Sequence, residues 1–169
     1  MPIVSGDIDI HLSGGASNTD TDASLGGAIS TTEVADASLH NLFDIVSSSE
    51  ASAGDTEYRC IYVKNNHGSL ALQSAVIWIQ TVTPSTDTVV AIALAGEGVN
   101  GTAETVADES TAPSGESFTS PTTEGAALSI GNIPAGEHQA VWIRRTVSSG
   151  ASAYTSDSVV LRVKGDTAA

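Results

Sequence analysis

The sequence predicts an all-β protein: an immunoglobulin-like antiparallel β-sandwich with an extended N-terminal arm that contains a short helix. Three observations predict it. Runs of alternating apolar and polar residues recur at hairpin spacing after about residue 56. They are separated by turns rich in Gly, Ser and Asn, with no helical pattern after residue 50. The 169 residues are 40% hydrophobic and 15% charged, enough for one core. We assign residues 1–55 to the arm and residues 56–166 to the sandwich.

Within the arm, residues 7–12 alternate polar and apolar side chains and predict a short strand. Residues 13–32 are rich in Gly, Ser, Thr, Asn and Asp, which predicts loop or extended chain. Residues 37–46 place four apolar side chains at helical spacing, so we expect one or two turns of amphipathic helix there. Residues 47–55 form a second polar linker.

Six further strands are expected in the sandwich, over residues 58–64, 72–82, 88–95, 127–130, 139–147 and 158–164. The intervening segment 96–124 is long and shows only weak strand patterns, near Thr105 and Phe118. Trp78 and Trp142 lie in the middle of strands. We expect them to pair between the two sheets and to fill the core.

Acidic residues dominate the charge, which totals −14. Residues 1–58 hold ten acids and residues 65–143 hold eight, and neither stretch contains Lys or Arg. A polyanion would be repelled, so the charge argues against nucleic acid as a partner. The six basic residues all lie in or beside expected strands: Arg59, Lys64, Arg144, Arg145, Arg162 and Lys164.

Neither a secretory signal nor a membrane span is expected. The N-terminus lacks a basic region followed by an apolar one, and no run approaches the ~20 apolar residues that cross a bilayer. The chain is therefore expected to be made in the cytoplasm and to have no membrane partner. The single cysteine, Cys60, excludes an intrachain disulfide and is expected to be a buried, inert thiol.

No catalytic, cofactor-binding or metal-binding residue is assigned from the sequence. The four histidines, which are His11, His40, His67 and His138, stand in no recognisable nucleophile or metal motif. The best cation candidate is the turn 18–22, with oxygen side chains at alternate positions. It departs from a calcium loop because Ala23 replaces the usual Gly and Ile29 the usual Glu, so a solvated acidic turn is expected.

Two segments carry a resemblance to known modules. Residues 58–66 (YRCIYVKNN) with Leu72–Ile79 resemble the opening of CARDB- and NEW3-type Ig modules. Residues 130–137 (IGNIPAGE) followed by 141–143 (VWI) resemble their closing turn and strand. This resemblance implies an Ig-like fold and specifies no function, because such modules serve many purposes.

The whole chain also resembles auxiliary structural proteins of tailed bacteriophages. The shared features are a short acidic chain, a small-residue N-terminal arm and one Ig-like domain with almost no Lys. The resemblance implies a virion protein, not an enzyme, that decorates or cements a capsid. It implies the major capsid protein or other virion subunits as partners, and a homo-oligomer.

Mechanistically, the arm would add to a sheet edge of a coat subunit, and we expect residues 1–50 to be ordered only in the assembly. Two alternatives stay open. One is a glycan- or host-surface-binding module using residues 96–124, where Phe118 is the only aromatic residue. The other is a head–tail or tail component. In each case a distinctive function is expected to lie in the arm and in residues 96–124.

Overall fold

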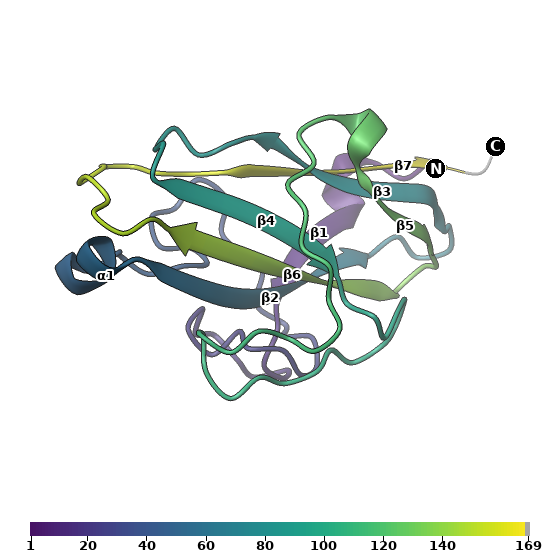
Figure 1. Ribbon diagram of the computed structural model, residues 1–169. Coiled ribbons are helices and arrows are strands. Elements are labelled where there is room, and N and C mark those ends of the chain that lie inside the picture. The colour runs from purple at the N-terminus through teal and green to yellow at the C-terminus, as the bar shows by residue number, and fades with distance from the viewer. Residues whose placement is uncertain (168–169) are drawn as a thin grey trace.

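The computed structural model describes residues 1–167 as two antiparallel sheets packed face to face (Figure 1). The four-stranded sheet has the order β1-β2-β6-β4, and the three-stranded sheet has the order β5-β3-β7. The strands are β1 (Ile8–Leu12), β2 (Asp55–Asn65), β3 (Leu72–Thr81), β4 (Thr88–Leu94), β5 (Leu128–Ile133), β6 (His138–Val147) and β7 (Val160–Thr167). The predicted all-β sandwich is confirmed.

The strands divide four and three, as in a constant-type immunoglobulin domain, whose sheets are ABED and CFG. β1, β2, β6 and β4 occupy the places of A, B, E and D. The three-stranded sheet differs, because β3 lies at its centre with β5 on one side and β7 on the other. β7 therefore pairs with β3 as F pairs with C, while β5 holds an edge that a constant-type domain leaves free.

Every expected strand forms, and most are longer than their alternation suggested. The weak patterns near Thr105 and Phe118 form no strand. Residues beside them make only isolated bridges, Gly27 with Ala103 and Ile92 with Thr119. Two 3-10 turns complete the regular elements, η1 (Ser5–Asp7) and η2 (Glu124–Ala126). No helix within residues 1–167 is long and apolar enough to cross a membrane.

The helix expected over residues 37–46 is wrong; the only α-helix within the described residues is α1 (Ser48–Ala53). Its start is fixed by a capping box, in which the backbone N–H of Glu50 donates to Ser47 Oγ and the N–H of Ser47 donates to the Glu50 carboxylate. Residues 37–46 contain positive φ angles at Ala37 and His40, both 54°. A right-handed helix cannot pass through them.

The main core fills the space between the sheets. It is built from the alternate residues of each strand that face inward, such as Ile61, Ile77, Ile92 and Ile143. Each of these side chains is at most 1% exposed. β1, from the arm, adds Ile8 and Ile10 at the rim of this core, because it pairs antiparallel with β2 as the edge strand of the sheet.

A second apolar cluster covers the opposite face of the four-stranded sheet. It contains Tyr58, Cys60, Tyr62 and Trp142. Its cover consists of residues 13–34 and 96–120, which together we call the loop layer. In Figure 1 most of the loop layer lies below β2 and β6, while the end of the 96–120 segment crosses in front of β6 and β4 towards η2. β3, β5 and β7 lie above β2 and β6. The four-stranded sheet is therefore covered on both faces, once by strands and once by loops.

The expected pairing of the two tryptophans in the core is wrong. Trp142 is fully buried in the second cluster, beneath the loop layer. Trp78 alternates with the core residues Ile77 and Ile79, so it lies on the outer face of the three-stranded sheet, with the Arg162 guanidinium 5.9 Å from its ring. Each tryptophan stands between two apolar β-branched residues, so the sequence does not show which face of its sheet the indole occupies.

Candidate functional site: the loop layer

The loop layer joins the two parts of the chain in which a distinctive function was expected. Residues 13–34 come from the arm and residues 96–120 from the long segment before β5. They meet at the bridge between Gly27 and Ala103 and at the hydrogen bond from Val106 N–H to Leu25 O, 2.9 Å long. The sequence did not show that these segments, about 80 residues apart, form one surface.

Tyr62 anchors both segments to the sheet. Its hydroxyl donates to Gly27 O at 2.6 Å and accepts from Ala103 N–H at 2.9 Å. Burial raises the pKa of this hydroxyl to about 12, so it keeps its proton at neutral pH. Beside it, Gly26 has a φ of +91°, and a Cβ there would lie 1.7 Å from Glu104 O. Only glycine allows this approach of the two segments.

Arg59 connects the same two segments through ion pairs. Its side chain is fully buried, and its guanidinium contacts Asp22 at 3.3 Å and Glu109 at 2.5 Å. Asp22 belongs to the arm and Glu109 to the 96–120 segment, so one buried cation holds both. The Asp22 and Glu109 side chains are 57% and 41% exposed, so solvent screens the two pairs and their main effect is to fix where the segments attach. The loop layer is thus attached to the sheet by polar contacts as well as by the second apolar cluster.

The charge of the loop layer is uniformly negative. It holds eight of the twenty acids and no Lys or Arg; the eight are Asp20, Asp22, Glu33, Glu97, Glu104, Asp108, Glu109 and Glu116. Of the six basic residues in the chain, only Arg162 and Lys164 are exposed, and both lie on β7 in the other sheet. The molecule is therefore most acidic on the face farthest from its exposed cations.

An apolar hollow lies within this acidic surface. It is lined by Gly14 and Gly15, by Ala23 and residues 25–28, and by Thr105 and Val106. Leu25 and Val106 supply its largest apolar side chains, and the glycines leave it open. An apolar centre with a charged rim is the usual anatomy of a surface that binds another protein.

The turn 18–22, the cation candidate from the sequence, lies in the loop layer with its oxygen atoms already engaged. Asn18 Oδ1 accepts the N–H of Asp20, and Asp20 Oδ1 accepts the N–H of Asp22. The Asp22 carboxylate contacts Arg59. These side chains fold the turn and hold it to the sheet.

Phe118, the aromatic residue of the glycan-binding alternative, is half-buried on the sheet. Its ring lies 5.4 Å from that of Tyr58 in an edge-on arrangement, and the Arg144 guanidinium lies 5.1 Å from its centroid. A sugar platform needs an open aromatic face. Here Tyr58 and Arg144 already occupy the surroundings of the ring, which gives Phe118 a role in packing.

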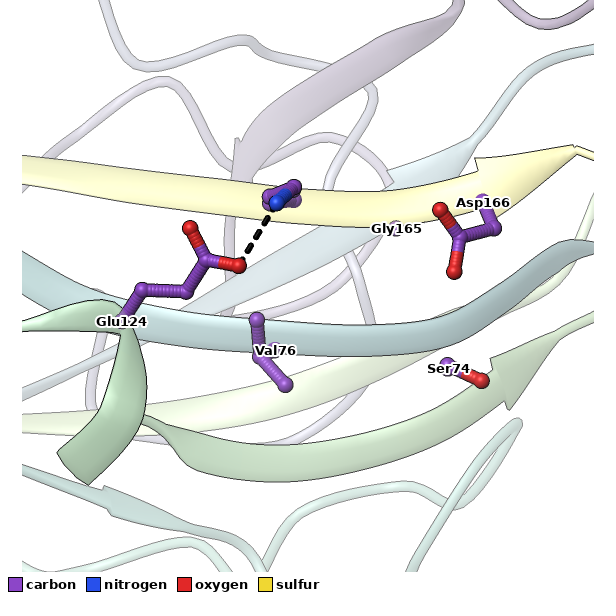
Figure 2. A pocket seen from close by; sticks show the side chains of 6 residues that line it. Ser74, Val76, Glu124, Gly165 and Asp166 are labelled. Carbon is purple, nitrogen blue, oxygen red and sulfur yellow. Dashed lines mark hydrogen bonds and ion pairs between the residues drawn. The ribbon is translucent and has the colours of Figure 1, made fainter.

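A second hollow lies on the outer face of the three-stranded sheet (Figure 2). It is lined by Ser74, Val76, Gly165 and Asp166, and the ion pair between Lys164 and Glu124, 2.6 Å long, closes one side. The lining is small and mostly polar and contains no aromatic side chain. This hollow presents no set of groups that would orient a ligand.

Buried charges gather where the loop layer meets the start of β2. The Glu57 carboxylate, on a residue 1% exposed, contacts Arg145, which also contacts Asp44 at 3.2 Å. Burial raises the pKa of Glu57 to about 7, and Arg145 offsets this only in part. Asp44, Glu57 and Glu109 bring carboxylate oxygens within 4.8 Å of one another. Arg59 and Arg145 already neutralise them, so the group is an ionic cluster of the fold.

The predicted burial of Cys60 is confirmed. The residue is 0% exposed, and burial raises the pKa of its thiol far above the usual range. The histidines do not gather in one site. His40 is exposed, His67 bonds the backbone at Ser69 and Leu70, and His138 packs edge-on against Tyr62. Burial lowers the pKa of His138.

Sequence reasoning missed the roles of Tyr62, Arg59 and Glu57. Part of the signal was present, because Glu57 and Arg59 stand in the same alternation as the core residues Ile61 and Val63. A charged residue in the apolar phase of a strand must find a partner.

Searches of protein-family models, of curated proteins and of solved structures found no match to this chain.

Proposed function

We propose that this protein is a virion structural protein that decorates or cements a phage capsid, and that the loop layer is its contact surface for coat subunits. The observation that carries the proposal is that arm residues 13–34 and residues 96–120 form one surface, without Lys or Arg, around an apolar hollow. The resemblance of the chain to auxiliary phage proteins supplies the class of partner.

Charge complementarity supports a basic partner surface. The loop layer holds eight carboxylates and no Lys or Arg, and within the described residues only Asp22 and Glu109 of these pair with a basic residue, Arg59 of β2. A basic patch on a coat subunit would be attracted over several ångströms, and the apolar hollow would then exclude water at the centre of the contact. Many copies on one shell make each contact effective even where a single contact is weak.

The arrangement of sheet edges refines how the arm takes part. β1 already pairs with β2, and residues 30–34 cover its outer side through the bonds Leu12 N–H to Thr32 O and Val34 N–H to Ile10 O. The arm thus contributes a face to the proposed contact. Within residues 1–167 no strand pairs with the outer edges of β5 and β7, which leaves these edges of the sandwich for neighbouring subunits.

The test is binding of the purified protein to shells that lack it, assembled by the virus that encodes this chain. The loop-layer variant is Glu97→Gln, Glu104→Gln, Asp108→Asn, in which each amide keeps the oxygen that accepts a backbone N–H. We expect the natural chain to bind in numbers that follow the shell symmetry. We expect the variant to bind at least tenfold more weakly and with a shallower dependence on salt.

The matched control removes three acids outside the loop layer and away from the free edges of β5 and β7, by Glu50→Gln, Asp87→Asn and Asp157→Asn. Its net charge changes by the same amount, so it separates a local contact from general charge. We expect it to bind shells like the natural chain. Absence of binding to shells, or equal losses in both variants, would refute the proposal. Binding at a single vertex instead of over the shell would place the protein at the neck or tail.

A further inference from the structure

We propose that Asp9, His11 and Glu33 form a binding site for one divalent transition-metal ion of the zinc class. Asp9 and His11 lie on β1, and Glu33 lies in the arm segment that runs beside it. One imidazole nitrogen and one oxygen from each carboxylate lie within 4.8 Å of one another. The site stands at the edge of the four-stranded sheet, where the loop layer begins.

The backbone accounts for the meeting of these three residues. Asp9 and His11 are two residues apart on a strand, so their side chains leave the same face. Glu33 is the antiparallel bridge partner of His11, which puts its side chain beside that of His11 on this face. The hydrogen bonds from Leu12 N–H to Thr32 O and from Val34 N–H to Ile10 O, 2.9 and 2.8 Å long, hold this register on either side.

His11 gives an independent indication of a ligand. Its residue is 5% exposed, and neither ring nitrogen has a hydrogen-bond partner within residues 1–167. A buried imidazole without a partner costs roughly 1–3 kcal/mol. The Tyr62 hydroxyl and the Asn65 amide on the neighbouring strand do find partners. Elsewhere in the described chain, four other side chains each leave one buried polar atom unpaired, whereas both ring nitrogens of His11 are unpaired. A metal ion between the imidazole and the two carboxylates would satisfy His11.

The donor set selects the class of ion. Calcium and magnesium prefer oxygen ligands alone, whereas an imidazole nitrogen favours zinc and its neighbours in the first transition series. Three protein ligands with a fourth position for water is a common zinc arrangement. The Asn66 amide also donates to the Asp9 carboxylate, which orients that ligand from outside the site.

Neither Asp9 nor Glu33 forms an ion pair within the described residues, so both carboxylates are free to bind a cation. Lys64, which lies opposite Asp9 in the β1–β2 register, is likewise without an ion pair there. The cluster of Asp44, Glu57 and Glu109 differs, because two arginines already bind its carboxylates. A metal at Asp9, His11 and Glu33 would fasten the arm segment at Glu33 to β1.

The experiment is isothermal titration of the full chain with zinc chloride after removal of metal by a chelator. The variants are His11→Asn and Glu33→Gln; Glu33 is exposed, so its change should leave the fold intact. The control is His40→Asn, at an exposed histidine outside the cluster, where Asn tolerates the positive φ of 54°. Titrations with calcium and magnesium chloride test the class of ion.

We expect one zinc ion per chain in the natural protein and in His40→Asn, with affinity at least tenfold lower in both site variants. Zinc should raise the melting temperature of the natural chain and leave that of Glu33→Gln nearly unchanged. Cobalt in place of zinc should give visible absorption bands that are lost with His11→Asn. The proposal is overturned if zinc does not bind, if Glu33→Gln binds it as tightly as the natural chain, or if calcium binds equally well.

Discussion

At the scale of single residues, this protein buries charge in the apolar phase of its strands. Glu57 and Arg59 share the alternation of Ile61 and Val63, and Arg145 shares that of Ile143. The sandwich can bury them because Glu57 and Arg145 are cross-strand neighbours and because Arg59 reaches Asp22 and Glu109. Buried ion pairs add little net stability, but they require one arrangement of their partners. They fix where the arm and the 96–120 segment attach.

The elevated pKa of Glu57 predicts a pH dependence of stability. The pKa is about 7 in the folded chain against 4.5 for an unperturbed glutamate carboxyl, so the folded state binds more protons between these values. The free energy of unfolding should therefore fall as pH rises from about 4.5 to 7, by at most about 3 kcal/mol from this group. Urea unfolding at pH 5 to 8 measures the effect, and Glu57→Gln should remove its part of the slope.

The control for this prediction is Glu124→Gln, which removes an exposed carboxylate paired with Lys164. Its profile should run parallel to that of the natural chain. His138 acts in the opposite direction, because its lowered pKa makes stability rise with pH through its titration. The informative quantity is therefore the difference between the natural and Glu57→Gln profiles. Parallel profiles for these two would show that Glu57 is ionised throughout.

At the scale of elements, the strands were predictable and the cover of the four-stranded sheet was not. Alternation located all seven strands because each has one face in the main core. β2 and β6 are apolar on both faces. Such a pattern predicts that both faces are covered, but it does not predict which part of the chain covers the face turned away from the main core. The cover consists of glycine-rich loops whose attachment depends on single contacts, such as those of Tyr62, and not on a periodic pattern.

The candidate site, too, could be predicted only in part. Composition indicated that the two loop segments are acidic and that a distinctive function would lie in them, but it did not indicate that they form one surface. Asp9 and His11 were predicted to share a strand, but Glu33 lies beyond the predicted loop 13–32 and joins them only through backbone pairing. The helix predicted at residues 37–46 from apolar spacing was wrong, because spacing alone does not stabilise so short a helix. The helix that forms, α1, starts at the capping box of Ser47.

Tyr62→Phe tests the attachment of the loop layer to β2. The change leaves the buried N–H of Ala103 and the carbonyl of Gly27 without the hydroxyl that pairs them. We expect a loss of about 1–3 kcal/mol in the free energy of unfolding and faster hydrogen exchange at Ala103. Tyr58→Phe is the matched control, since the Tyr58 hydroxyl has no hydrogen-bond partner among residues 1–167. Equal losses in both variants would contradict a specific role for the Tyr62 hydroxyl.

At the scale of the whole molecule, the arm and the sandwich share their cores. β1 completes one edge of the four-stranded sheet, and residues 13–34 provide half of the loop layer over Cys60 and Trp142. A chain whose arm left the sheet would expose much of the second apolar cluster to water, at about 25 cal/mol for each Å² uncovered. The sequence-based expectation that residues 1–50 are ordered only in an assembly therefore has a measurable consequence in the isolated chain.

Cys60 reports whether the arm leaves the sheet. It is fully buried, its N–H donates to Ser24 O in the arm, and it is the only thiol in the chain. We expect the dilute monomer to react with a thiol reagent at least a hundredfold more slowly than its urea-unfolded form, because labelling must wait for the loop layer to open. Labelling as fast as in urea would mean that the arm is detached until it meets a partner.

A pair of glycine variants separates opening of the layer from general loss of stability. Gly26→Ala places a Cβ 1.7 Å from Glu104 O and should force the two loop segments apart. Gly15→Ala has a similar positive φ, +97°, and no atom within 4 Å of its Cβ, so it carries the backbone strain without the collision. We therefore expect Cys60 to label much faster in Gly26→Ala than in Gly15→Ala. Equal rates in the two variants would show that the close contact at Gly26 does not hold the loop layer over the sheet.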